Sequence, residues 1–186
     1  MVFNFLKSKH NKADLIFKKN IKKILEHGNW DENPRPKYED GIPAHSLFIT
    51  QIVEEYDISK GEFPITSLRP IPYKNSGKEM LWIYQDQTSD LSVLKDKYNI
   101  HWWDSWNIGD NTIGQRYGAT VSRYQLVQRL LNGLKEDKYG RRHIISMWQE
   151  KEFAEKHGLK PCAFMTQWNI RHGNDGIDYL DMCLTQ

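Results

Sequence analysis

The chain has 186 residues, of which 39% are hydrophobic and 27% are charged. These fractions are typical of a folded domain and argue against a disordered, fibrous or membrane protein. The formal net charge is only +2, so no whole-molecule field favours nucleic acid, and any anion site has to be built locally. The length predicts a single domain over residues 1–186.

The first predicted element is a lysine-rich amphipathic helix. Apolar residues recur at helical spacing over 14–26, and Gly28 follows as a stop signal. Its neighbourhood is rich in lysine: Lys7, Lys9, Lys12, Lys18, Lys19, Lys22 and Lys23. We interpret these lysines as a solvated helix face, with an RNA or membrane-surface patch as the alternative. No apolar run is long enough for a signal peptide or a membrane span, so we expect a cytoplasmic protein without membrane contact.

The middle of the chain alternates turn signals with periodic segments. Three prolines in the stretch 29–43 predict a loop, and β-branched and aromatic residues over 46–56 predict a strand. Apolar residues at helical spacing then predict helices over 76–85, 91–98 and 124–134.

Three β-type runs follow, over 143–148, 163–171 and 177–185. The turn signal at 172–176 predicts that the last two form a hairpin. Helices followed by sequential strands favour an α+β fold with a largely antiparallel or mixed sheet.

Two cysteines are too few for a disulfide framework, and neither has zinc-ligand spacing, so we expect reduced thiols and no metal. Cys162 follows Pro161 at the entry to a predicted strand, which is a fixed position suited to a nucleophilic thiolate. The alternative is a small buried residue. Cys183 lies inside an apolar run and is interpreted as structural.

Glu79 lies three residues after Ser76, before an apolar run, and this spacing matches a helix-capping box. The functional alternative is a carboxylate that faces a pocket and relays protons through water. Arg141 and Arg142 stand at the entry to a strand. Surface salt bridges would explain them, but both could serve one anion if the segment is irregular there.

In chain order, several blocks resemble thymidylate synthases. They are FPIT at 63–66, KEMLW at 78–82, WDSW at 103–106, IGQRYG at 113–118, RRHIISMW at 141–148, PC at 161–162 and YLDMCLTQ at 179–186. The resemblance covers most of 63–186. It implies the family's α+β fold, with a mixed β-sheet, helices packed on one face and a homodimer interface at the other.

The resemblance also implies a reaction and its residues. Cys162 would attack C6 of deoxyuridylate (dUMP), while Glu79 and Tyr117 would organise water for proton transfers. The co-substrate would be 5,10-methylenetetrahydrofolate, bordered by Trp103 and Trp106. For the nucleotide phosphate, the resemblance implies Arg141 and Arg142 from the dimer partner, with Arg35 as the candidate early phosphate-binding arginine.

The sequence departs from the family pattern at two places. Ala163 stands where a histidine is common, and the chain ends at Gln186, before the family's Arg-Ser motif and C-terminal segment. We therefore expect a C-terminally truncated family domain. Two alternatives stay open at this point: a pyrimidine nucleotide hydroxymethylase of the same family, and a non-catalytic subunit that binds nucleotide or RNA, including its own messenger RNA.

Overall fold

A computed structural model describes residues 11–154 and 159–186. The chain divides into two compact units, Met1–Tyr73 and Lys74–Gln186. Each unit is described by itself. The single domain predicted from the sequence stays a prediction.

The first unit is built on helix α2 (Lys12–His27), which confirms the predicted N-terminal helix. Asn11 caps it by accepting the backbone N–H of Asp14, and Gly28 closes it by donating to the carbonyl of Ile24 at 2.8 Å. Buried Asp14 accepts the backbone N–H and the hydroxyl of Ser67. These hydrogen bonds lower the pKa of Asp14, and the bond from the Ser67 hydroxyl has the largest effect. The carboxylate thereby anchors Ser67 to the start of the helix.

The predicted strand over 46–56 is mostly wrong. Only β2 (Leu47–Phe48) is a strand there, and it pairs antiparallel with β1 (Asn29–Trp30). Because β1 is only two residues long, the residues after Phe48 have no partner strand there with which to form backbone hydrogen bonds. The short 3₁₀ helix η1 (Ile58–Lys60) comes next.

Lys18, Lys19, Lys22 and Lys23 are exposed, as the solvated-face interpretation and its surface-patch alternative both require. Lys12 differs, because its ammonium pairs with the carboxylate of Glu62. Lys7 and Lys9 lie outside the described residues. No helix in the described part of the chain is both long and apolar enough to cross a membrane.

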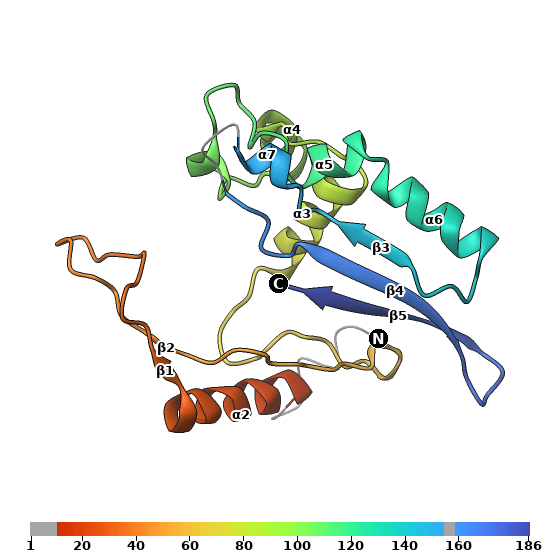
Figure 1. The fold of residues 1–186 in the computed structure, drawn as a ribbon, viewed down its shortest axis with the longest axis horizontal. Helices are drawn as coiled ribbons and strands as arrows, with labels where there is room; N and C mark the ends of the chain where they lie inside the picture. The colour runs from red at the N-terminus through yellow and green to blue at the C-terminus, as the bar shows by residue number, and fades with distance from the viewer. Residues whose placement is uncertain (1–10, 155–158) are drawn as a thin grey trace. The chain divides into compact units, whose positions relative to one another are not determined.

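The second unit packs helices against a three-stranded sheet (Figure 1). Its helical elements are α3 (Tyr73–Tyr84), which starts at the unit boundary, α4 (Leu91–Tyr98), η2 (Asp104–Trp106), α5 (Gly118–Arg123), α6 (Leu126–Glu136) and α7 (Glu150–Ala154). Its strands are β3 (His143–Ser146), β4 (Met165–His172) and β5 (Asp178–Thr185).

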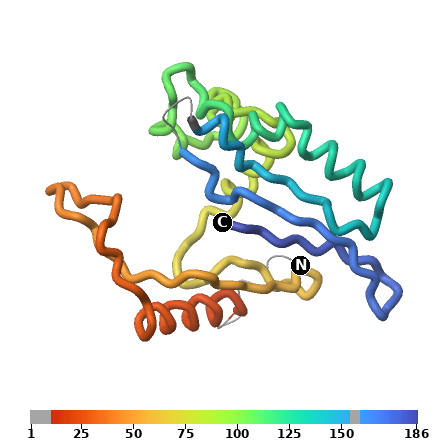
Figure 2. The backbone as a smooth tube through the Cα atoms, in the orientation of Figure 1, coloured from red at the N-terminus to blue at the C-terminus, as the bar shows by residue number. Residues whose placement is uncertain are grey.

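The sheet has the order β3-β4-β5 and is antiparallel throughout (Figure 2). The β4 and β5 strands form the predicted hairpin, whose turn closes with the N–H of Gly173 donating to the carbonyl of Ile177 at 2.8 Å. Gly176 adopts a φ of 77°, which explains the glycine at this turn. These strands confirm the α+β fold class.

The two faces of the sheet differ. A Cβ on Gly133 of α6 would lie 2.9 Å from the ring of His143, so His143 and its alternate neighbour Ile145 face the helices and are buried. Ile144 points to the opposite face and is 47% exposed. The core between helices and sheet centres on Trp82, Ile83, Leu91, Leu94, Ile100, Val121 and Ile145.

The predicted helix over 124–134 is displaced. Helix α5 ends at Arg123 and α6 begins at Leu126, because Gln125 has a left-handed φ of 50° that breaks the helical path. The helix predicted over 91–98 coincides with α4.

Candidate active site

Cys162 lies in a bend just before β4, directly after the buried Pro161. Its thiol is free and the residue is exposed, so the buried structural role considered for Cys162 is wrong. The backbone N–H of Cys162 donates to the hydroxyl oxygen of Tyr117 at 3.0 Å. This bond ties the candidate nucleophile to a side chain 45 residues earlier in the chain.

Cys183 is also free and exposed. The structural role predicted for it from its apolar neighbours is therefore not supported within this chain. Side chains on both faces of β5 are mostly exposed, so the apolar neighbours of Cys183 do not bury it.

Glu79 projects from α3 and is half-buried. Its Oε1 accepts the indole N–H of Trp103 at 2.9 Å, and its Oε2 accepts that of Trp102 at 3.0 Å. Burial raises the pKa of Glu79, and the two indole hydrogen bonds act in the opposite direction. A carboxyl group with a raised pKa holds a proton more readily than an ordinary glutamate, which suits it to proton transfer.

The capping-box interpretation of Glu79 is wrong. Helix α3 begins at Tyr73, directly after Pro72, so Ser76 is already the fourth helical residue and is not the cap that precedes the helix. The proton-relay alternative is the one that matches this position.

Tyr117 stands at the start of α5 with φ 49° and ψ −111°, a strained backbone for a residue with a side chain. A Cβ on the next residue, Gly118, would lie 2.1 Å from the carbonyl oxygen of Thr88, so only glycine permits this approach. The Tyr117 ring meets the Trp103 ring edge to face at 5.4 Å.

Burial raises the pKa of Tyr117, and the hydrogen bond from the Cys162 backbone acts in the opposite direction. The phenol therefore keeps its proton at neutral pH. Tyr117 links the three residues, because its hydroxyl accepts the Cys162 N–H and its ring contacts Trp103, which donates to Glu79. The structure thus brings the three predicted catalytic residues together.

Arg141 and Arg142 are exposed and precede β3, so the segment is irregular as a shared anion site requires. Among the described residues, neither guanidinium has an ion pair or a side-chain hydrogen bond, and the salt-bridge alternative finds no support there. Arg35 belongs to the first unit, where it is exposed between Pro34 and Pro36.

The predicted folate-binding tryptophans differ in exposure. Trp106 ends η2 and is 40% exposed, whereas Trp103 is 8% exposed and uses its indole N–H on Glu79. Sequence reasoning missed Trp102, which is 43% exposed and contacts the same carboxylate. The adjacent pair Trp102 and Trp103 was the only hint in the sequence, but a sequence pattern does not show which group an indole N–H contacts.

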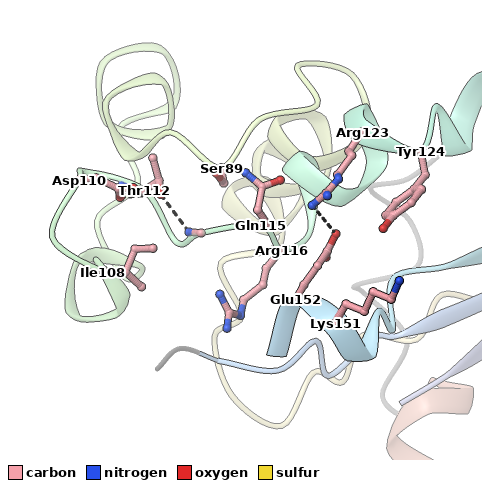
Figure 3. Close-up of a pocket in the computed structure, with 11 residues that line it drawn as sticks. Ser89, Ile108, Asp110, Thr112, Gln115, Arg116, Arg123, Tyr124, Lys151 and Glu152 are labelled. Carbon is pink, nitrogen blue, oxygen red and sulfur yellow. Dashed lines mark hydrogen bonds and ion pairs between the residues drawn. The ribbon is translucent and has the colours of Figure 1, made fainter. Parts of the chain in front are cut away.

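A cavity of about 350 Å³ lies elsewhere in the second unit (Figure 3). Arg123 of α5 and Glu152 of α7 line it and form an ion pair at 3.3 Å. Cys162, Glu79 and Tyr117 are not among its lining residues. Within residues 11–154 and 159–186, no group of three or more His, Cys, Asp or Glu side chains could hold a metal ion.

Comparisons with known proteins identify the family of this chain. The family model described as thymidylate synthase matches residues 15–186. A thymidylate synthase of Lactococcus lactis subsp. cremoris is 54% identical over 174 residues, which are 94% of this chain and 62% of the relative. A thymidylate synthase of Streptococcus sanguinis is 54% identical over 175 residues, with the same shares of the two chains.

A solved structure gives the same result for the fold. The thermostable thymidylate synthase A of Bacillus subtilis superposes with a TM-score of 0.80 at 32% identity, covering 91% of this chain and 63% of that one. The chain thus spans about 62% of the length of the curated relatives that it matches. On these matches, the chain belongs to the thymidylate synthase family.

Proposed function

We propose that this chain carries the nucleophile of a thymidylate synthase, which converts dUMP to thymidylate with 5,10-methylenetetrahydrofolate as co-substrate. The observation that carries the proposal is the cluster of an exposed thiol, a protonated phenol and a half-buried carboxyl group. Membership of the family supports the same reaction. The two free cysteines suit a reducing cytoplasm.

Cys162 begins the reaction. Its thiolate adds to C6 of the pyrimidine, and the electron pair of the C5–C6 double bond moves to C5 and O4 as an enolate. This covalent step makes C5 nucleophilic toward a one-carbon donor. After C5 has gained the methylene carbon, loss of the C5 proton expels the folate nitrogen and leaves an exocyclic methylene on the ring. Hydride addition to this methylene then restores the C5–C6 double bond and expels the thiolate, which frees Cys162.

Glu79 and Tyr117 handle the protons. Glu79, with its raised pKa, exchanges protons with O4 and C5 through water, and the Tyr117 hydroxyl orients that water while it holds the Cys162 backbone. Methylenetetrahydrofolate supplies the methylene carbon and then a hydride, and leaves as dihydrofolate. Exposed Trp106 and the edge of Trp103 would border it.

Arg141 and Arg142 supply positive charge for the nucleotide phosphate, with Arg35 as a third candidate. Their exposure and their lack of ion pairs among the described residues support this role. A guanidinium without a carboxylate partner is available for bidentate hydrogen bonding to an anion. In a homodimer that forms over the sheet face of Ile144, this pair would reach the phosphate bound to the partner.

The test is a covalent trap. The protein is incubated with 5-fluorodeoxyuridylate and methylenetetrahydrofolate, alone and with the C-terminal remainder of the Lactococcus relative supplied as a separate polypeptide. Intact mass is expected to show a ternary adduct. Cys162→Ala should lose it completely, whereas Cys183→Ala, which removes the other exposed thiol, should retain it.

Absence of the adduct under both conditions would contradict the proposed function. An adduct that forms with 5-fluorodeoxycytidylate but not with the uracil analogue would instead identify a cytosine nucleotide as the substrate, as the hydroxymethylase alternative requires.

A further inference from the structure

Two adjacent indoles bind the two oxygens of one carboxylate. Trp103 Nε1 donates to Glu79 Oε1 at 2.9 Å, and Trp102 Nε1 donates to Oε2 at 3.0 Å. We infer that Trp102 is a positioning residue which, as the second of two indole donors, holds the plane of the Glu79 carboxylate fixed for proton transfer. This inference rests on the proposed function and assigns a role to a residue outside the predicted catalytic set.

The geometry explains why a second donor matters. The last torsion of a glutamate side chain has a broad energy profile, so one hydrogen bond leaves the carboxylate plane free to rotate. A second bond to the other oxygen removes that freedom. A proton relay gains from this because its efficiency depends on the orientation of donor and acceptor.

The local backbone makes the double contact feasible. In a strand, neighbouring side chains point to opposite faces. Here the N–H of Asp104 donates to the carbonyl of His101 at 3.1 Å, so 101–104 form a turn with Trp102 and Trp103 at its centre. Lys95 of α4 fixes the end of this turn through an ion pair with Asp104 at 3.2 Å.

The two indoles have different roles in packing. Trp103 is 8% exposed and contacts the rings of Trp82 and Tyr117, so it is part of the core. Trp102 is 43% exposed. Its removal therefore opens little core volume, and its hydrogen bond to Glu79 can be tested without unfolding the protein.

The charges around Glu79 define the expected response. Tyr117 at the start of α5 interacts with Glu79 and, through its hydroxyl, with the backbone N–H of Cys162 in the bend before β4. On α3, the ammonium of Lys78 is bound to the carbonyl of Tyr98 at 3.1 Å. In and beside the indole turn, the Asp104 carboxylate lies 3.2 Å from the Lys95 ammonium and 3.6 Å from the His101 ring nitrogen.

Loss of the Trp102 donor has a definite sign. Both indole bonds favour the charged carboxylate and lower the pKa of Glu79, against the burial that raises it. Trp102→Phe removes one N–H and keeps an aromatic ring over the site. The pKa of Glu79 should therefore rise further, so that less of the group is ionised at neutral pH.

The first experiment needs no tryptophan variant. In the wild-type chain, NMR follows the carbon-13 signal of the Glu79 carboxyl group and the nitrogen-15 signal of the Trp102 indole during a pH titration. Both signals are expected to titrate with one shared midpoint, and the indole titration should vanish in Glu79→Gln. A Trp102 indole that does not respond to Glu79 ionisation would overturn the inference.

The second experiment compares two tryptophan variants. Trp102→Phe is expected to raise the Glu79 midpoint, whereas Trp148→Phe, which removes an exposed indole that donates to Glu150, is expected to leave it unchanged. A midpoint that is unchanged or lowered in Trp102→Phe contradicts the role. These readouts need no turnover, so a failed adduct test with a shared midpoint would count against the proposed function alone.

Discussion

The two regions of the candidate site differ in whether contacts within the chain hold their side chains. Around Glu79, Tyr117 and Cys162, hydrogen bonds within the second unit hold the Glu79 carboxylate and the Cys162 backbone, and burial raises the pKa values of Glu79 and Tyr117. Arg141 and Arg142 are exposed and have no ion pair among the described residues. The difference is that the groups proposed for covalent chemistry are held by contacts within the unit, whereas the arginines proposed for phosphate binding have no ion pair among the described residues.

The largest expected effect comes from breaking the arranged region at Gly118. In Gly118→Ala the new methyl group would lie 2.1 Å from the Thr88 carbonyl oxygen and 2.6 Å from the Thr88 nitrogen, so the backbone that carries Tyr117 must shift. We expect the free energy of unfolding to fall by about 3 kcal/mol, measured by chemical denaturation.

The matched control is Gly77→Ala in α3, where an added Cβ meets no atom within 4 Å. Alanine in a helix interior should increase the free energy of unfolding by about 1 kcal/mol. Equal stabilities for the Gly118 and Gly77 variants would show that Thr88 does not approach position 118 so closely.

For the exposed pair Arg141 and Arg142, we expect a large effect on dUMP binding and a small effect on stability. Replacing Arg141 and Arg142 by alanine should weaken dUMP binding about tenfold to a hundredfold for each arginine lost, as removal of a charged hydrogen bond does. The free energy of unfolding should change by no more than about 0.5 kcal/mol, because no partner in the described part of the chain loses a contact. Calorimetric titration and denaturation measure the two quantities.

Arg171→Ala is the control for this pair. Arg171 is an exposed arginine of the same unit that pairs with Asp181 at 3.0 Å. Its loss should leave dUMP affinity at the wild-type value. If Arg171→Ala weakens dUMP binding as much as the double variant does, the effect is one of general charge and the assigned phosphate site is wrong.

The smallest expected effect is that of Tyr117→Phe, which leaves the Cys162 N–H without its acceptor and should cost about 1 kcal/mol of stability. Burial raises the pKa of Tyr117 above the ordinary 10.0. The stability that this shift contributes is therefore complete below about pH 10 and is lost as pH rises through the folded value. Tyr117→Phe should lack this alkaline loss.

Tyr84→Phe is the control that separates the effect of burying a tyrosine on stability from an effect on the reaction. Burial also raises the pKa of Tyr84, so this variant should reduce the alkaline loss of stability in the same direction. Only Tyr117→Phe should slow adduct formation with 5-fluorodeoxyuridylate. Identical adduct rates in the two variants would remove Tyr117 from the catalytic cluster.

Periodicity predicted the elements that are long and pair with near neighbours. Helix α4 and the β4–β5 hairpin appear where the pattern placed them, because local spacing and a glycine turn determine both. The strand over 46–56 failed because strand pairing needs a partner of similar length, and β1 is two residues long.

The site residues were predictable by type but not by geometry. The blocks that hold Cys162, Glu79 and Tyr117 pointed to their chemistry, but not to the strained backbone of Tyr117 or to the Trp102 contact. Both depend on tertiary packing that overrides local preference. The capping box at Ser76 failed for the same reason, since helix α3 starts earlier than its apolar pattern.

The most direct test of the arranged cluster is to locate the trapped nucleotide within the chain. After incubation with 5-fluorodeoxyuridylate and methylenetetrahydrofolate, proteolysis and peptide mass spectrometry should find the added mass on the peptide that contains Cys162 and none on the one that contains Cys183. Added mass on Cys183, or divided equally between the two thiols, would contradict the account.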